Sequence, residues 1–285
     1  MTSQPGADVR VDPHLGTVVH VVGTRQARPN LPSTGCPFCP GGLEAPEPYD
    51  VRWFTNRWPA MPGDRCDVVL YTSEHDATFA SLGVPGARKV IDLWAERFTA
   101  LGSRADVGYV LIFENRGPEV GATIAHPHGQ IYAYDHVPDR PGRLLAGGWR
   151  PDASPERFVA EAGDWVAAVP VASTFPIALS LAPRTRVPEL SALDDTGRDQ
   201  LAALLVDVLA RLDRLYDRPL PYMMWFNQRP TDGGQWPDAW LNLEIVSPWR
   251  SAGTARFIAA AEVACAEYFN PVIPELLAEQ LRALS

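Results

Sequence analysis

The order of predicted elements repeats in the two halves of the chain, and this repeat limits the folds that the chain can adopt. Each half holds short strands on both sides of one long amphipathic helix. The two helices are expected over residues 88–103 and about 195–216, where apolar side chains recur at helical spacing. Strands grouped around one helix with hairpin-like connections are typical of α+β units and not of a doubly wound parallel sheet. We therefore predict an α+β fold built from two similar units.

The expected strands are short runs rich in β-branched and aromatic residues. They cover residues 16–22, 51–56, 67–72, 107–115, a stretch that begins at 126, and then 164–171, 176–183, 221–228 and 238–246. Further helices are expected near residues 253–268 and 274–284. A turn-rich region that ends at Pro155 separates the halves, so the prediction is of two domains, residues 1–155 and 156–285.

The composition argues against several classes of protein. A net charge of −9 disfavours general nucleic-acid binding, which relies on a basic surface that neutralises phosphate. No apolar run approaches the roughly 20 residues of a membrane-spanning helix, and the N-terminus shows no secretory signal. Four cysteines do not make a disulfide framework in a cytoplasmic chain of 285 residues. We expect a cytoplasmic protein that binds neither nucleic acid nor membrane.

A cysteine pair stands in a segment that cannot form regular structure by itself. Residues 29–50 are rich in proline and glycine and contain Cys36 and Cys39 in the sequence CPFC. A two-residue gap lets both thiolates bind one Zn²⁺ ion. Redox pairing and chance are the alternatives, and the redox role normally requires a thioredoxin-like βαβ context that this segment lacks.

The stretch GATIAHPHGQIYAY, residues 121–134, concentrates polar groups at the start of a strand. His126, His128 and Gln130 occupy alternate positions, so their side chains converge on one surface of the strand. Pro127 cannot donate to a strand ladder, which places the pair at a strand start or at a sheet edge. Two histidines with ordinary hydrogen bonds on a polar face are the alternative to a functional site.

Paired histidines suit metal ligation and nucleophilic or acid–base chemistry. A zinc site with Cys36 and Cys39 needs two more ligands, and His75 and His126 each stand beside a predicted strand. Four protein ligands would make one closed, structural zinc site per chain. The ligands are too scattered for a compact DNA-binding finger.

The next polar positions on the strand would then remain available for chemistry. The neutral imidazole of His128 could attack phosphorus and form a phosphoramidate. The amide of Gln130 could donate a hydrogen bond to a phosphate oxygen as charge builds there.

These residues resemble those of the galactose-1-phosphate uridylyltransferase family, a branch of the histidine-triad superfamily. The resemblance is carried in order by RVDPHLGTVVHVVGTRQARPN, CPFC, WFTNRWPAM, SEHDATF, FENRG and GATIAHPHGQ. It implies two histidine-triad-like domains, each with a largely antiparallel sheet and packed helices. It also implies transfer of UMP from a nucleotide sugar to a sugar 1-phosphate, by a ping-pong route through uridylylated His128.

The resemblance further implies roles for individual residues. Gln130 would stabilise the phosphate, and the four residues named above would be the zinc ligands. The nucleotide contacts would be Arg25, Arg28, Asn56, Asn115, Gly121, Ala122, Thr123 and Gln130, and the substrate contacts Arg256 and Glu262. The resemblance also implies a homodimer in which each site is built from both chains.

The second half departs from the family pattern. The segments PYMMWFNQRP and AWLNLEIV contain no histidine, and Asn227 and Asn242 stand where some members carry ligands of a second metal. Arg256 stands where the family has a lysine. We therefore expect one metal site and an acceptor other than galactose 1-phosphate. A nucleotide-sugar or dinucleotide phosphorylase or hydrolase, and a non-catalytic nucleotide-binding protein, are the alternatives.

Overall fold

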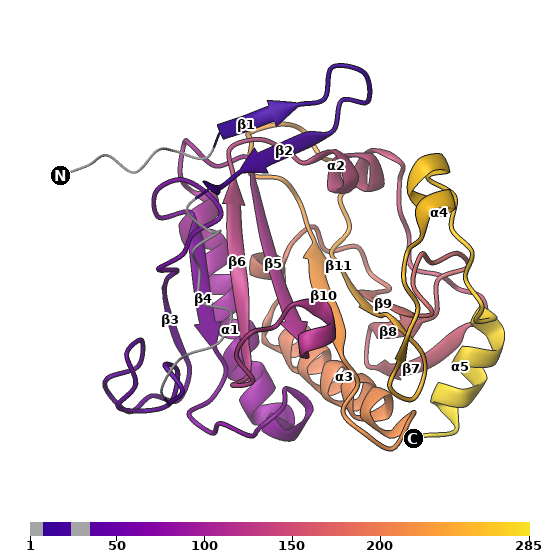
Figure 1. The fold of residues 1–285 in the computed structure, drawn as a ribbon. Coiled ribbons are helices and arrows are strands. Elements are labelled where there is room, and N and C mark those ends of the chain that lie inside the picture. Colours follow the sequence, from indigo (N-terminus) through magenta and orange to yellow (C-terminus); the bar gives the residue numbers. More distant parts are fainter. Residues whose placement is uncertain (1–7, 24–34) are drawn as a thin grey trace.

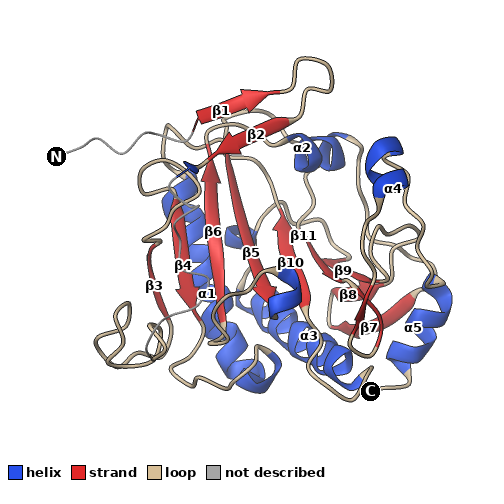
Figure 2. Ribbon diagram, viewed as in Figure 1, coloured by secondary structure: helices blue, strands red, loops and turns tan. Residues whose placement is uncertain are grey.

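The computed structural model describes residues 8–23 and 35–285, and its centre is one nine-stranded sheet (Figures 1 and 2). The strand order is β3-β4-β6-β5-β10-β11-β9-β8-β7, and every neighbouring pair is antiparallel. The strands are β3 (Arg52–Thr55), β4 (Cys66–Leu70), β5 (Tyr109–Arg116), β6 (His128–Tyr134), β7 (Phe158–Ala162), β8 (Trp165–Ala168), β9 (Ile177–Pro183), β10 (Tyr222–Asn227) and β11 (Asn242–Ser247).

The remaining elements flank this sheet. Two small hairpins pair β1 (Asp8–Val11) with β2 (Val18–Val21), and β12 (Trp249–Ser251) with β13 (Thr254–Ala255). The α-helices are α1 (Gly83–Gly102), α2 (Asp139–Ala146), α3 (Asp195–Arg214), α4 (Ala260–Cys265) and α5 (Pro274–Arg282). Single 3-10 turns occur at Ala80–Leu82, Pro118–Val120 and Leu190–Ala192.

The repeat seen in the sequence is also a repeat in the topology. The first half runs β3, β4, α1, β5, β6 and places its strands in the order 3-4-6-5. The second half runs β8, β9, α3, β10, β11 and gives the same order, 8-9-11-10. The two units join where β5 pairs with β10, with Phe113 opposite Trp225. The α+β prediction is confirmed, and the two expected sheets form one continuous sheet.

Helices α1 and α3 pack together behind one face of the sheet (Figure 1). The face of α1 predicted to be apolar is buried, including Val90, Trp94 and Phe98. On β6, Ile131 and Ala133 belong to the same core. Because side chains alternate along a strand, His128 and Gln130 lie on the opposite face, away from the two helices.

Several segments differ from the sequence prediction, which did not include strands β1 and β7. The helix expected over 253–268 is reduced to α4, because Gly253 adopts a left-handed φ of 67° and turns the chain into the β12–β13 hairpin. Conversely, the proline-rich region after β6 contains helix α2. Pro141 lies in the first turn of this helix, where its missing N–H has no helical partner to lose.

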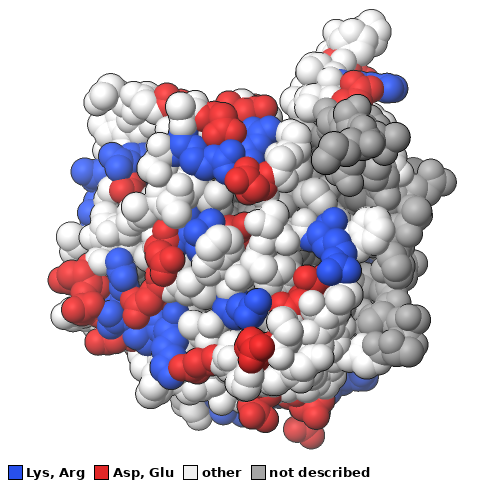
Figure 3. Space-filling view, turned by 90° about the vertical axis from the view of Figure 1, so that its left-hand side faces the viewer, with Lys and Arg blue, Asp and Glu red and all other residues white. Residues whose placement is uncertain are grey.

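The charged residues are mixed over the surface. Figure 3 shows acidic and basic side chains interspersed on the face that it draws. Several form ion pairs, as Arg88 does with Asp92, Asp195 and Asp199. Among the helices of residues 8–23 and 35–285, none is long and apolar enough to cross a membrane.

Candidate metal and nucleotide site

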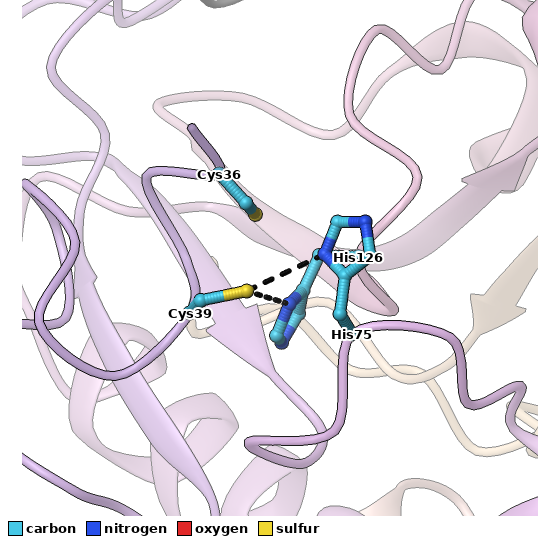
Figure 4. A group of neighbouring side chains, drawn as sticks. All are labelled: Cys36, Cys39, His75 and His126. Atoms are coloured by element: carbon cyan, nitrogen blue, oxygen red, sulfur yellow. Dashed lines mark hydrogen bonds between the residues drawn. The ribbon is translucent and has the colours of Figure 1, made fainter. Parts of the chain in front are cut away.

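Three separate segments bring four potential metal ligands together (Figure 4). Cys36 and Cys39 come from the loop before β3, His75 follows β4, and His126 precedes β6. Their ligand atoms all lie within 4.8 Å of one another. Cys39 Sγ is 3.4 Å from His75 Nδ1 and 3.6 Å from His126 Nδ1.

This donor set fits a tetrahedral Zn²⁺ ion. Bonds of about 2.3 Å to sulfur and about 2.0–2.1 Å to nitrogen would bring neighbouring ligand atoms to roughly 3.3–3.8 Å from each other. Burial, and then the adjacent Cys36, raise the pKa of the Cys39 thiol, because two thiolates side by side repel each other. A cation between them would relieve that repulsion.

The cysteine loop is held in shape by its own backbone. Gly42 N donates to Cys39 O at 2.8 Å, and Glu44 N donates to Pro37 O at 2.9 Å. A Cβ atom on Gly42 would lie 2.6 Å from the carbonyl oxygens of Cys36 and Pro37. Only glycine therefore allows this close turn around the cysteine pair.

His126 is fully buried and oriented by hydrogen bonds. Its Nε2 atom is 2.8 Å from both Thr72 O and Tyr49 Oη. A carbonyl oxygen can only accept, which assigns the proton to Nε2 and leaves the lone pair of Nδ1 on the side of Cys39. Burial lowers the pKa of His126, and the neutral form is the one that binds a metal.

His128 is the first residue of β6 and is half-buried. Its Nδ1 atom lies 2.8 Å from His126 O, so Nδ1 donates to that carbonyl and the lone pair stands on Nε2. The Phe38 ring meets the His128 ring edge-on, with centroids 5.1 Å apart. The His128 imidazole thus contacts two residues from the metal-binding region, His126 through Nδ1 and Phe38 through its ring.

A pocket of about 370 Å³ opens beside His128. Its volume lies within the range typical of small-molecule sites, roughly 300–1,000 Å³. The lining residues come from the segment after β4, the end of β5 and the segment before β6, and they are Ala77, Thr78, Phe79, Glu114, Asn115, Arg116, Gly117, Pro118, Ala122, Thr123, Ile124, Ala125, His126, Pro127 and His128.

The predicted nucleotide contacts are partly gathered here. Asn115, Ala122 and Thr123 line the pocket, and Gly121 makes the left-handed turn directly before them, with a φ of 87°. Gln130 lies two residues along β6 on the face of His128 and outside the lining.

Asn56, another predicted contact, is not among the residues that line this pocket. Asn56 follows β3, and its side chain accepts from Trp58 N at 2.9 Å in a local turn. Arg25 and Arg28 fall outside the described residues.

Glu114 is a pocket residue that sequence reasoning did not single out. It is 4% exposed and accepts a hydrogen bond of 2.8 Å from the Tyr222 hydroxyl. Burial raises the pKa of this carboxyl to about 7. The alternation of side chains along the strand could have identified Glu114, because it shares the core face of β5 with Val110 and Ile112.

In the second half, the corresponding strands carry a polar cluster. Asn227 Nδ2 donates to Asn242 Oδ1 and to Glu244 Oε1, both at 2.8 Å. Arg140 of helix α2 pairs with Glu244 at 2.7 Å and lies over the ring of Trp225. These polar groups thus satisfy one another.

Arg256 and Glu262, the predicted substrate contacts, form a buried ion pair with each other. Arg256 also donates to Thr174 O at 2.8 Å, and Glu262 accepts from Ala259 N and Phe269 N. They line a separate pocket of about 430 Å³, which shares no lining residue with the pocket at His128. Within one chain, the structure does not bring them to the histidine.

Comparisons with known proteins agree over nearly the whole chain. The model of the galactose-1-phosphate uridyl transferase N-terminal domain matches residues 53–138, and that of the C-terminal domain matches residues 122–285. A galactose-1-phosphate uridylyltransferase of Thermotoga maritima is 32% identical over 96% of this chain and 98% of its own length. One of Streptomyces lividans is 37% identical over 79% and 70%. A solved uridylyltransferase structure superposes with a TM-score of 0.88 at 27% identity and covers 97% of this chain and 98% of its own.

Proposed function

The chain belongs to the galactose-1-phosphate uridylyltransferase family and is a uridylyltransferase, and we propose that it works by a ping-pong route through a covalent intermediate on His128. The observation that carries this proposal is the bond between His128 Nδ1 and His126 O, beside a pocket of nucleotide size. It keeps the Nδ1 proton in place and presents the lone pair of Nε2 as the nucleophile.

The two steps are balanced displacements at phosphorus. In the first, His128 Nε2 attacks the α-phosphorus of a nucleotide sugar, and the sugar 1-phosphate leaves with the electron pair of the broken P–O bond. In the second, a phosphate oxygen of another sugar 1-phosphate attacks, and the electron pair of the broken P–N bond returns to Nε2. Positive charge on the ring of the intermediate is stabilised by His126 O at Nδ1.

Other residues hold the nucleotide in this proposal. The amide of Gln130, on the same face of β6, donates to a phosphate oxygen as charge develops. The lining residues Asn115, Ala122 and Thr123, with the adjacent Gly121, contact the nucleotide. Asn56, Arg25 and Arg28 are proposed as further nucleotide contacts on the family resemblance alone.

Zinc is the proposed metal, held by Cys36, Cys39, His75 and His126, one ion per chain. With four protein ligands, the ion would have no position open for substrate, so its role would be to brace the cysteine loop against the start of β6. The proton on His126 Nε2 leaves Nδ1 as the ligand atom, as this role requires.

We further propose a homodimer. Two segments leave large apolar side chains in solvent that a second copy would cover: the β1–β2 hairpin, with Val11 and Leu15, and the segment around α4, with Phe257 and Phe269. A partner could then supply the substrate contacts Arg256 and Glu262, which lie apart from His128 in one chain. The domain division is proposed at residues 155 and 156, between α2 and β7.

The proposed acceptor is a sugar 1-phosphate other than galactose 1-phosphate, because the second half carries Asn227 and Asn242 in a closed polar cluster and Arg256 in place of a lysine. The rate at which different sugar phosphates discharge the uridylylated protein tests this choice. Discharge that is fastest with galactose 1-phosphate would contradict it.

The test of the mechanism is the intact mass of the protein after incubation with UDP-glucose alone. We expect a gain of one uridylyl group in the wild type and none in His128→Ala. His136→Ala is the matched control, because His136 is a partly exposed histidine just after the same strand, and it should retain the adduct. Absence of any adduct with every nucleotide sugar tried would refute the covalent route. Consumption of UDP-glucose with phosphate or water alone would favour a phosphorylase or hydrolase.

A further inference from the structure

Tyr49 stands at the junction of all three segments that build the metal site. Its phenol oxygen lies 2.7 Å from Phe38 O, 2.8 Å from Thr72 O and 2.8 Å from His126 Nε2. Phe38 lies between the two cysteines, Thr72 precedes the loop that carries His75, and His126 directly precedes strand β6. One side chain thus contacts each segment.

The number of donor protons at this junction leaves few possible hydrogen-bond arrangements. The two carbonyl oxygens of Phe38 and Thr72 can only accept, and the phenol and the imidazole Nε2 each have one proton to give. Both carbonyls are satisfied when His126 donates to Thr72 and Tyr49 donates to Phe38. Removal of the hydroxyl would leave Phe38 O without this donor and would take one of the two fixed contacts from His126 Nε2.

Phe38 extends this junction to the nucleophile. Its backbone is held by Tyr49, and its ring packs edge-on against both His126 and His128, with centroids 6.1 Å and 5.1 Å away. The ring is buried in a small apolar cluster with Val68 and Leu70 of strand β4. A shift of the Phe38 backbone would therefore change the wall against which the His128 imidazole rests.

We propose that Tyr49 is a positioning residue that couples the metal-binding loop to the nucleophile. It fixes the orientation of His126 toward the metal and, through Phe38, the orientation of His128 toward phosphorus. This inference rests on the proposed function of His128. Of the three hydrogen-bond contacts of the Tyr49 hydroxyl, only that with His126 Nε2 reaches a residue that lines the pocket, so we expect its effect on the reaction to be transmitted by position.

The experiment compares Tyr49→Phe with the wild type by two measurements. Zn²⁺ affinity, measured by competition with a chromogenic chelator, should fall about 10- to 100-fold, as is usual when the outer hydrogen-bond partner of a ligand is removed. The rate of uridylylation of zinc-saturated protein by UDP-glucose should fall roughly 10-fold, while the KM for UDP-glucose stays within about twofold, because the pocket lining is untouched.

Two further variants test the contribution of the Phe38 ring and the specificity of the Tyr49 substitution. Phe38→Leu keeps the carbonyl that Tyr49 contacts and removes the aromatic wall, so it should slow uridylylation while zinc affinity stays within a few-fold. Tyr216→Phe is the matched control, because Tyr216 is a half-buried phenol that packs against Trp249 in the second half. It should change neither quantity.

Unchanged zinc affinity and unchanged uridylylation in Tyr49→Phe would overturn the proposal. So would a variant that is merely less stable to heat but reacts at the wild-type rate once saturated with zinc. If the wild type itself forms no uridylyl adduct, the proposed function fails. The zinc affinity of Tyr49→Phe would then still decide whether Tyr49 orients the metal ligand His126.

Discussion

Substitution of Gly129 by alanine tests how tightly strand β6, which carries the proposed nucleophile, is packed. Gly129 lies between His128 and Gln130 and faces the helices. A Cβ atom at this position would lie 2.1 Å from Tyr71 Oη and 3.0 Å from Phe113 O. Tyr71 cannot swing away, because it is 1% exposed and packed edge-on against Phe79 and Trp94. The strand must therefore move, and His128 and Gln130 move with it.

Insertion of one carbon into a filled core costs about 1–3 kcal/mol, and a 2.1 Å approach places this case at the upper end. For a chain of this size the melting temperature should fall by roughly 3–5 °C in scanning calorimetry. Uridylylation of zinc-loaded Gly129→Ala should also slow, because the proposed nucleophile, His128 Nε2, is displaced.

Two variants make the test decisive. Tyr71→Phe removes the atom closest to the new Cβ, so the double variant should recover most of the loss, and a double-mutant cycle should show favourable coupling. Gly142→Ala in helix α2 is the control, since its Cβ would make only an ordinary 3.6 Å contact, and it should be neutral or stabilising by about 0.5–1 kcal/mol. A melting temperature of Gly129→Ala within one degree of the wild type would refute the packing argument.

Two more predictions concern charge. Removal of zinc by a chelator, or Cys39→Ser, should lower the melting temperature and slow uridylylation together, and confirmed loss of the metal with neither effect would contradict a structural role. Burial raises the pKa of Glu114 from 4.5 to about 7. Between these two pH values the folded state holds a proton that the unfolded state releases. This carboxyl therefore makes the free energy of unfolding fall as pH rises from about 4.5 to 7. Urea unfolding of the wild type and of Glu114→Gln at pH 5 and pH 8 measures this effect. The decrease in unfolding free energy between the two pH values should be smaller by about 2–3 kcal/mol in the variant. An identical decrease in both proteins would show that Glu114 does not titrate in this range.

Much of the fold was predictable because its local patterns are strong. Apolar residues at helical spacing predicted α1, and Val90, Trp94 and Phe98 are all buried there. Alternation along β6 predicted the shared face of His128 and Gln130, and the structure has it. The four proposed zinc ligands could be chosen from sequence because a two-residue cysteine gap demands a second pair of ligands, and the structure brings these four together.

The unpredicted features depend on contacts between distant segments. The pairing of β5 with β10 joins residues more than one hundred positions apart, and no local pattern encodes it. The role of Tyr49 could not be predicted for the same reason, since this loop tyrosine makes its contacts only when Phe38, Thr72 and His126 come together around it. Arg256 and Glu262 were predicted to contact substrate, and their mutual ion pair appears only once α4 is folded against the chain before β9.

The duplicated topology explains why only one half can carry the proposed nucleophile. His128 is the first residue of β6 and Gln130 the third, and in the second half Asn242 and Glu244 hold the same positions on β11. An amide nitrogen has no lone pair available for attack on phosphorus, and Glu244 is committed to Asn227 and Arg140. Because Arg140 lies on the helix that directly follows β6, this cluster ties the end of β6 to the second half. The equivalent positions in the second half thus form a structural brace between β11, β10 and helix α2.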